Sequence, residues 1–135
     1  MEWKSSFSVG VWELDVQHRG LLELINEIGQ MADAGSPSKS EAFGSLNAMI
    51  CYAENHFSTE EEYLSRYNYP RLEQQQKEHA AFVETAFSLA DDLEKQGALS
   101  LGTIIMYLQD WYTDHVLGAD QEYKEFLADK LNAGQ

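Results

Sequence analysis

The side chains best suited to chemistry in this sequence are its histidines and the carboxylates that follow two of them. The chain has only four histidines, which are His18, His56, His79 and His115. Glu60 follows His56 by four residues, so on a helix both side chains project from one face, a turn apart. Asp120 follows His115 by five residues, and Gly118 between them lets the backbone turn both side chains inward. Imidazole combined with carboxylate favours iron, manganese or zinc over calcium, so the pattern predicts a metal site.

The apolar residues that must position these groups recur with helical periodicity along most of the chain. Pro37 and Pro70 are the only prolines, and each interrupts such a run. A first helix is expected over about residues 15–34 and ends at Gly35-Ser36-Pro37-Ser38, where the glycine stops one helix and the serine caps the next. The later helices are expected over residues 43–64, from Pro70 toward Gly97, from residue 101 toward Gly118, and, as a short tail, over residues 121–131.

Short connections between long amphipathic helices predict an all-α fold. We expect an up-down-up-down antiparallel four-helix bundle with an N-terminal arm and a short C-terminal helix, and residues 1–135 forming one domain. Each of the four long helices then carries one histidine. A lone histidine on an apolar helix face is more often a core or surface residue, but four with none left over indicate a shared site.

Composition narrows the classes of partner. The formal net charge is −14, with 9 Lys+Arg against 23 Asp+Glu, which argues against nucleic acid or an anionic membrane surface as a partner. No segment approaches the length of a membrane span, and the first residues lack the layout of a signal peptide. Cys51 is the only cysteine and cannot form an internal disulfide. These features predict a cytoplasmic protein.

Four stretches together resemble the motifs of one family. Residues 7–10 and Leu14-Asp15-Val16-Gln17-His18 are similar to its opening, and His56-Phe57-Ser58-Thr59-Glu60-Glu61 is similar to its HFxxEE motif. Residues 69–82, from Tyr-Pro to Glu-His-Ala-Ala-Phe, and His115-Val116-Leu117-Gly118-Ala119-Asp120 match its remaining two motifs. The chain thus resembles the hemerythrins, and in particular the bacterial hemerythrin-like domains, over nearly its whole length.

This resemblance implies a non-heme di-iron centre. By analogy with the family, His18 and His56 would bind one iron, His79 and His115 the other, and Glu60 and Asp120 would bridge the two. The implied cofactor is a pair of iron ions (Fe2+/Fe3+) with an oxo or hydroxo bridge, and dioxygen or a small anion is the implied exogenous ligand.

Two positions depart from the family pattern. The family has a fifth histidine four residues before the one that matches His79, and this chain has Gln75 there. Gln75 could itself be a weak ligand of the iron bound by His79 and His115, or water or a small anion could fill the coordination position of the missing histidine. That iron could also be bound loosely, or Gln75 could be a hydrogen-bond donor beside the metals. The glutamine could also be an engineered change. We favour water or an anion.

Tyr112 stands three residues before His115, where the family usually has an aliphatic residue lining the dioxygen pocket. Its hydroxyl could approach an exogenous ligand or the metal, or it could be a core tyrosine bonded to a helix end or solvent.

The expected function is dioxygen binding, for sensing oxygen or redox state rather than for simple carriage. A signalling effector domain or protein would then be the partner. The alternatives are a di-iron enzyme, acting as an oxidase, a peroxidase or on nitric oxide, and a ligand-depleted metal-binding bundle with a structural or interaction role. We expect a binding protein rather than an enzyme.

Overall fold

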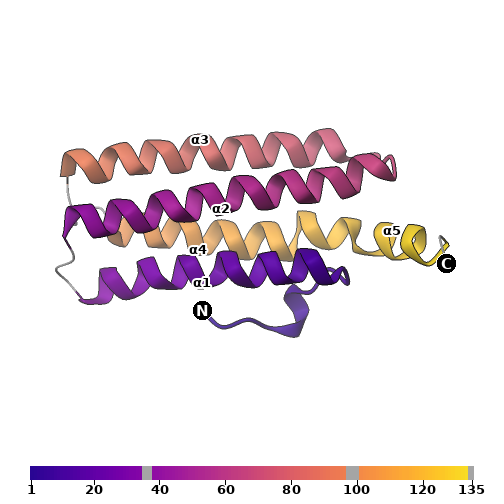
Figure 1. Ribbon diagram of the computed structural model, residues 1–135, viewed down its shortest axis with the longest axis horizontal. Coiled ribbons are helices and arrows are strands. Elements are labelled where there is room, and N and C mark those ends of the chain that lie inside the picture. The colour runs from indigo at the N-terminus through magenta and orange to yellow at the C-terminus, as the bar shows by residue number, and fades with distance from the viewer. Residues whose placement is uncertain (35–37, 97–100, 134–135) are drawn as a thin grey trace.

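The computed structural model describes residues 1–34, 38–96 and 101–133. The described residues form a short 3-10 helix and five α-helices, namely η1 (Ser5–Phe7), α1 (Trp12–Ala34), α2 (Lys39–Arg66), α3 (Leu72–Gln96), α4 (Leu101–Leu117) and α5 (Ala119–Ala133). Helices α1 to α4 run side by side as an antiparallel bundle, and α5 extends beyond the end of α4 (Figure 1). The predicted all-α bundle with an N-terminal arm and a C-terminal helix is confirmed.

The helix ends follow from local chemistry. The Ser38 hydroxyl accepts a hydrogen bond from the backbone N–H of Glu41 at 3.0 Å, so it caps α2 as predicted. Asn68 adopts a left-handed backbone conformation, with φ of 56°, in the turn that ends α2. Helix α3 begins two residues after Pro70 rather than at it. The predicted stops at Gly35 and Gly97 lie outside the described residues.

Helix α1 begins at Trp12, three residues before the predicted start. Asp15 explains this difference, because its carboxylate accepts hydrogen bonds from the backbone N–H of Val9 at 2.8 Å and from the Ser8 hydroxyl at 2.6 Å. Asp15 therefore fastens the N-terminal arm to the first turn of the helix, where a negative charge is also favoured by the helix dipole.

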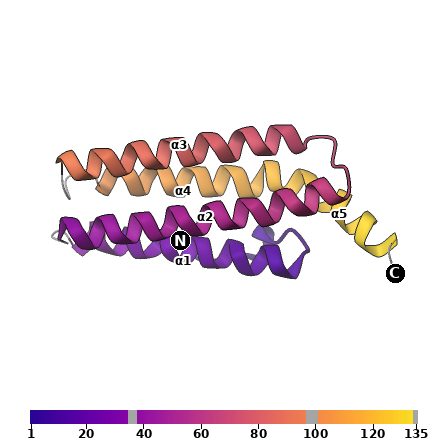
Figure 2. The ribbon, with the colours of Figure 1, turned by 45° about the horizontal axis from the view of Figure 1, so that its top comes forward.

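In the bundle, α1 lies against both α2 and α4, and α2 lies against α3. Seen from the turned view, α5 projects past the turn between α2 and α3 (Figure 2). No helix in the described part of the chain has the length and hydropathy required to cross a membrane.

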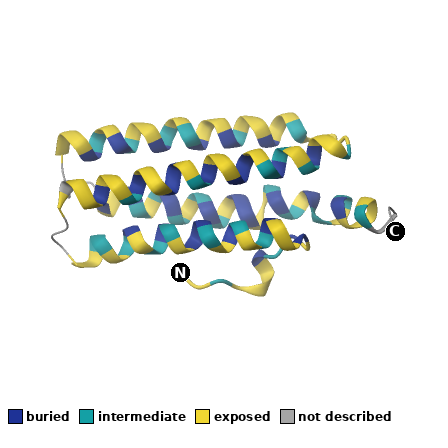
Figure 3. Cartoon of the chain, viewed as in Figure 1, coloured by how far each residue is buried: buried dark blue, intermediate teal, exposed yellow. Residues whose placement is uncertain are grey.

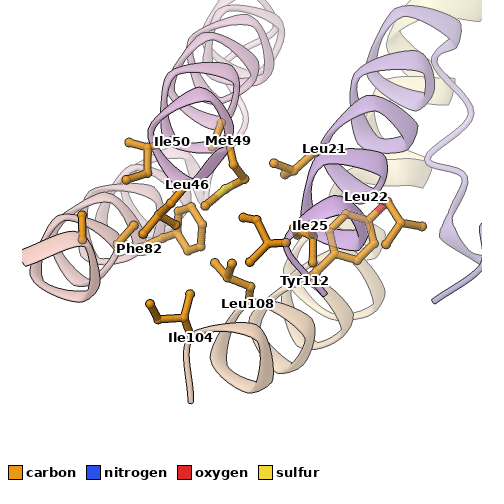
Figure 4. Close-up of a cluster of buried hydrophobic side chains, with 14 of the residues drawn as sticks. Leu21, Leu22, Ile25, Leu46, Met49, Ile50, Phe82, Ile104, Leu108 and Tyr112 are labelled. Atoms are coloured by element: carbon orange, nitrogen blue, oxygen red, sulfur yellow. The ribbon is translucent and has the colours of Figure 1, made fainter. Parts of the chain in front are cut away.

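Buried side chains face the interior of the bundle, while the outer faces are exposed (Figure 3). They form two apolar clusters. The main cluster fills the bundle with residues from α1 to α4, including Leu21, Ile25, Leu46, Met49, Phe82, Ile104 and Leu108 (Figure 4). The end cluster joins the segment before α1, the start of α1, the end of α2, the turn after it, and α5. Its members are Val9, Val11, Leu14, Leu64, Tyr69, Tyr123 and Leu127. A layer of buried polar residues separates the two clusters along the helices.

Candidate metal centre

The buried polar layer contains all six predicted metal ligands. Each is at most 6% exposed, and they are His18 on α1, His56 and Glu60 on α2, His79 on α3, His115 on α4 and Asp120 on α5. Four helices of the bundle and the terminal helix thus direct imidazoles and carboxylates to one place. The ligand atoms form two groups that could hold a metal ion, and Glu60 belongs to both.

Glu60 divides its two oxygens between the two halves of the site. Its Oε2 lies 3.3 Å from Nε2 of His18 and 3.2 Å from Nε2 of His56. Its Oε1 lies 3.0 Å from Nε2 of His79 and 4.0 Å from Nε2 of His115. One carboxylate therefore faces two pairs of histidines, which is the arrangement expected of a bridging ligand.

Asp120 repeats this division from the opposite side. Its Oδ2 lies 3.2 Å from Nε2 of His18, and its Oδ1 lies 3.1 Å from Nε2 of His115. Donor atoms bound to one cation at about 2.0–2.2 Å are separated by roughly 3 Å when adjacent. The spacing of the side chains therefore fits two cations that share Glu60, with Asp120 in contact with His18 on one side and His115 on the other.

The proton on His56 can be placed from its neighbours. Gln17 Nε2 donates to the Thr59 hydroxyl at 3.3 Å, and that hydroxyl in turn donates to the backbone oxygen of Asn55, so Gln17 directs its carbonyl oxygen at His56. His56 Nδ1 donates to this oxygen at 2.7 Å. Burial lowers the pKa of His56 and favours the neutral ring, so Nε2 presents a lone pair. This lone pair faces an oxygen of Glu60 at 3.2 Å, a repulsive contact unless a metal cation or a proton lies between them.

The other half of the site is supported by carboxylates. His79 Nδ1 lies 2.8 Å from Oε2 of Glu61, and His115 Nδ1 lies 3.6 Å from Oε2 of Glu78. A carboxylate at the outer nitrogen fixes the orientation of the ring and makes the inner nitrogen a stronger donor to a metal. The two halves therefore differ, because His56 has a neutral amide in this place.

Without a metal, the site would hold protons. Burial lowers the pKa of His18, but hydrogen bonds to Asp120 and Glu60 outweigh burial and raise it to about 10. Burial also raises the pKa of Glu60, but the neighbouring histidines His56, His18 and His79 bring it well below its ordinary value. A site that stabilises carboxylate anions and positive charge in this way is suited to exchanging protons for metal cations.

The two positions that depart from the family pattern also line this site. Gln75 is buried, and its amide nitrogen lies 3.3 Å from Oδ1 of Asp120. Tyr112 is buried in the main cluster, and its hydroxyl donates a hydrogen bond to the backbone oxygen of His18 at 2.9 Å. The ring of Phe7 from the N-terminal arm packs edge-on against Tyr112 at 5.7 Å. Tyr112 thus connects the arm to the chain segment that carries a predicted ligand.

The joint between α4 and α5 places Asp120. Gly118 lies between the two helices, and a Cβ atom added there would be 2.6 Å from the backbone oxygen of Asp114. Only glycine therefore fits this close approach. The joint turns Asp120 inward in the first turn of α5, as the spacing of His115 and Asp120 led us to expect.

Tyr123 is a residue of the site that sequence reasoning missed. Its side chain is fully buried, and its hydroxyl donates a hydrogen bond to Oε2 of Glu60 at 2.8 Å. Burial raises the pKa of Tyr123 well above its ordinary value, so the hydroxyl stays protonated. The available signal was its position three residues after Asp120 on the same helix, which places both side chains on one face.

Replacing Tyr123 by phenylalanine should weaken metal binding while the fold is kept. The ring remains, but Glu60 loses its hydroxyl donor, and removing a partner of a metal ligand typically costs 10- to 100-fold in affinity. We expect a loss of roughly that size in competition with a chelator. Tyr63→Phe is the matched control, because it removes a tyrosine–carboxylate hydrogen bond of 2.8 Å to Glu13 at the surface. Equal metal affinity in both variants would mean that Tyr123 does not orient Glu60.

Comparison with known proteins agrees with this geometry. The family model described as the hemerythrin HHE cation binding domain matches residues 9–127. A hemerythrin-like protein of Naegleria gruberi is 30% identical over 125 residues, which cover 93% of this chain and 92% of that protein. A bacteriohemerythrin of Clostridium acetobutylicum is 26% identical over 126 residues, which cover 90% of this chain and 96% of that protein.

Solved structures show the same fold. The crystal structure of a wild-type hemerythrin superimposes with a TM-score of 0.81 at 23% identity, covering 94% of this chain and 97% of that one. The family model spans most of the chain and includes all six of the buried residues predicted to bind metal. This chain therefore belongs to the hemerythrin family and is similar to the bacteriohemerythrins.

Proposed function

We propose that this chain is a non-heme di-iron protein that binds dioxygen. The observation that carries the proposal is the placement of the carboxylate oxygens. Glu60 and Asp120 each direct one oxygen to one half of the site and the other oxygen to the other half. Inward-facing carboxylates and histidines on facing helices are how helical bundles build two-iron sites. A pair of ferrous ions would supply the electrons that dioxygen needs in order to be held reversibly or reduced.

The chain's own contribution is to hold the ions and to pack aromatic rings against their ligands. The Phe57 ring stacks on His79 at 4.0 Å with an interplanar angle of 6°, and the Trp111 ring stacks on His115 at 4.6 Å and 12°. Phe82 packs against both of these aromatic rings. The aromatic walls limit the motion of the ligands and lower the local dielectric constant, which strengthens the attraction between cations and carboxylates.

Gln75 and Tyr112 are proposed to shape the pocket around the ions. The hydroxyl of Tyr112 is engaged by the backbone of His18, so its contribution is to fix that segment and to fill the space beside the site. Gln75 replaces an imidazole that the family resemblance would supply, so the half of the site that contains His79 has two histidines.

We further propose that the protein senses oxygen or redox state, with a signalling effector domain or protein as its partner. The replacement of a histidine by Gln75 supports this proposal, because a metal with fewer fixed ligands is more open to exogenous molecules and to oxidation. Oxidation of the ferrous pair by oxygen would then change the state of the site, which suits a sensor better than a carrier.

Iron content and the visible spectrum test the proposal. Protein prepared without oxygen should contain two irons per chain, and charge-transfer bands should appear in the near ultraviolet when air is admitted. One iron or none, without these bands, would contradict a di-iron site. Steady turnover of peroxide or nitric oxide by the iron-loaded protein would instead support the enzyme alternative. The His56→Ala variant is the matched control, and it should lose the two-iron state together with the bands.

A further inference from the structure

The amide of Gln75 has a fixed orientation. Gln75 lies on α3 one turn before His79, and its side chain is 2% exposed. Its nitrogen donates hydrogen bonds to the backbone oxygen of Ala119 at 3.1 Å and to Oδ1 of Asp120 at 3.3 Å. Because both partners are acceptors, they determine which end of the amide is nitrogen and which is oxygen.

The carbonyl oxygen of Gln75 is therefore left as a buried acceptor. Oε1 accepts no hydrogen bond from any residue in the described part of the chain. A buried polar atom is unfavourable unless a donor or a cation contacts it. Oδ1 of Asp120, which the amide nitrogen contacts, also lies 3.1 Å from Nε2 of His115, so Gln75 borders the half of the site that contains His79 and His115.

The donors on this half are two imidazoles, from His79 and His115, and one oxygen each from Glu60 and Asp120. Two histidines with a carboxylate are the donor set of non-heme iron sites that keep positions for exogenous molecules. The nitrogen of Gln75 is occupied by two acceptors, so only its oxygen is available to such a molecule.

We propose that the metal ion held by His79 and His115 keeps a position for an exchangeable small molecule that binds through an O–H oxygen, such as water or hydrogen peroxide. The O–H group of this molecule donates a hydrogen bond to Oε1 of Gln75. This inference rests on the proposed two-metal function and adds the class of molecule that this half of the site accepts. Anions that can only accept hydrogen bonds, such as azide, are disfavoured there.

A surface pocket borders this half of the site at His115. It has a volume of about 280 Å³, lies between α3 and α4, and includes His115 and Ala119 in its wall. Glu78 and Asp114 also line it, and Oε2 of Glu78 is buried beside His115. These two carboxylates present negative charge to a molecule that enters the pocket, so a neutral protic molecule is favoured over an anion.

Exchangeable water can be counted on the chain loaded with cobalt(II), which follows iron in affinity for nitrogen and oxygen ligands. The readout is the paramagnetic broadening of the water oxygen resonance in isotopically labelled water, together with metal content. Gln75→His should reduce the broadening by about half if each ion holds one such water, because the imidazole occupies the position. Equal broadening in the two proteins would overturn the inference, since the amide oxygen itself would then be the ligand. Fewer than two cobalt ions in the unmodified chain would instead contradict the two-metal site.

Azide binding tests whether the carbonyl oxygen of Gln75 favours molecules that donate a hydrogen bond. Gln75→Leu removes the acceptor, so azide should bind the cobalt-loaded variant roughly tenfold more tightly than the unmodified chain, as followed by absorption titration. Unchanged azide affinity in a variant that still holds two cobalt ions would show that Oε1 of Gln75 does not disfavour azide. Gln74→Leu and Gln74→His are the matched controls, because Gln74 is the exposed neighbour on the same helix. If Gln75→Leu does not hold two ions, the comparison of Gln75→His with the unmodified chain still decides the inference.

Discussion

Replacing Glu60 by glutamine is expected to abolish the loading of two metal ions. The amide keeps the size of the side chain but has one oxygen, so it cannot offer an oxygen to each half of the site as Glu60 does. Removing a group that merely supports a ligand costs 10- to 100-fold in metal affinity, so loss of a shared ligand should cost at least about 100-fold. Metal analysis after dialysis against a weak chelator measures the effect.

The metal-free variant should remain folded. Its amide oxygen can still accept a hydrogen bond from Nε2 of His18, but the charge that stabilises protonated His18 is lost, so unfolding without metal should occur at a lower temperature and remain a single transition. The unmodified chain should gain stability when metal is added, because a ligand that binds only the folded state stabilises it. Glu62→Gln is the matched control, since Glu62 is exposed on the same helix and pairs with Arg66 at the surface. Two ions in Glu60→Gln would show that Glu60 is not a bridging ligand.

The metal-free chain is expected to lose stability as the pH rises from neutral toward about 10. Hydrogen bonds to Asp120 and Glu60, which outweigh burial, raise the pKa of His18 to about 10, whereas an unfolded histidine titrates near 6.5. A group whose pKa is raised by folding contributes its full stabilisation below the unfolded value and loses it as the pH passes the folded value. Burial lowers the pKa of His115, but the charge of Asp120, its hydrogen bond to the ring and the charges of Glu60 and Glu78 together outweigh burial and raise it, which acts in the same direction.

Groups with the opposite shift act at lower pH. The pKa of Glu60 is lowered by the histidines despite its burial, so its contribution is present above the ordinary value of about 4.5 and is lost in acid. Burial lowers the pKa of His56, so protonation of this ring also opposes folding in acid.

Thermal unfolding of the metal-free and metal-loaded chains between pH 7 and about pH 10 tests the alkaline loss. Metal replaces protons on the histidines, so the loaded chain should lack this loss and metal affinity should rise over the same range. His18→Gln is the matched variant, and its metal-free form should show a flatter profile. An equal alkaline loss in His18→Gln would contradict the assignment of the effect to His18.

Much of the site could be predicted because its ligands repeat the helical period. His56 and Glu60 are one turn apart within a single helix, so their common face follows from spacing alone. The bundle followed from the same periodicity, since long amphipathic helices with short connections have few ways to bury their apolar faces. Iron as the metal, and sensing as the role, remain predictions.

The contacts that cross between helices could not be predicted in the same way. Gln17 precedes His18 in sequence, yet it bonds to His56 on another helix. Glu78 precedes His79, yet it faces His115. Such contacts depend on how each helix is rotated and shifted along its axis relative to its neighbours, and tertiary packing alone sets these quantities.

The end cluster has a consequence for the order in which the molecule assembles. Its members come from residues 9–14, 64–69 and 123–127, so they are joined only after widely separated parts of the chain have met. Asp120 arrives with α5, which is synthesised after α1 to α4. A nascent chain can thus form the main cluster and receive ions through the end that α5 has yet to cover. Once α5 has docked, an ion can leave by this end only after the end cluster opens, and this makes residence at the site a matter of kinetics as well as affinity.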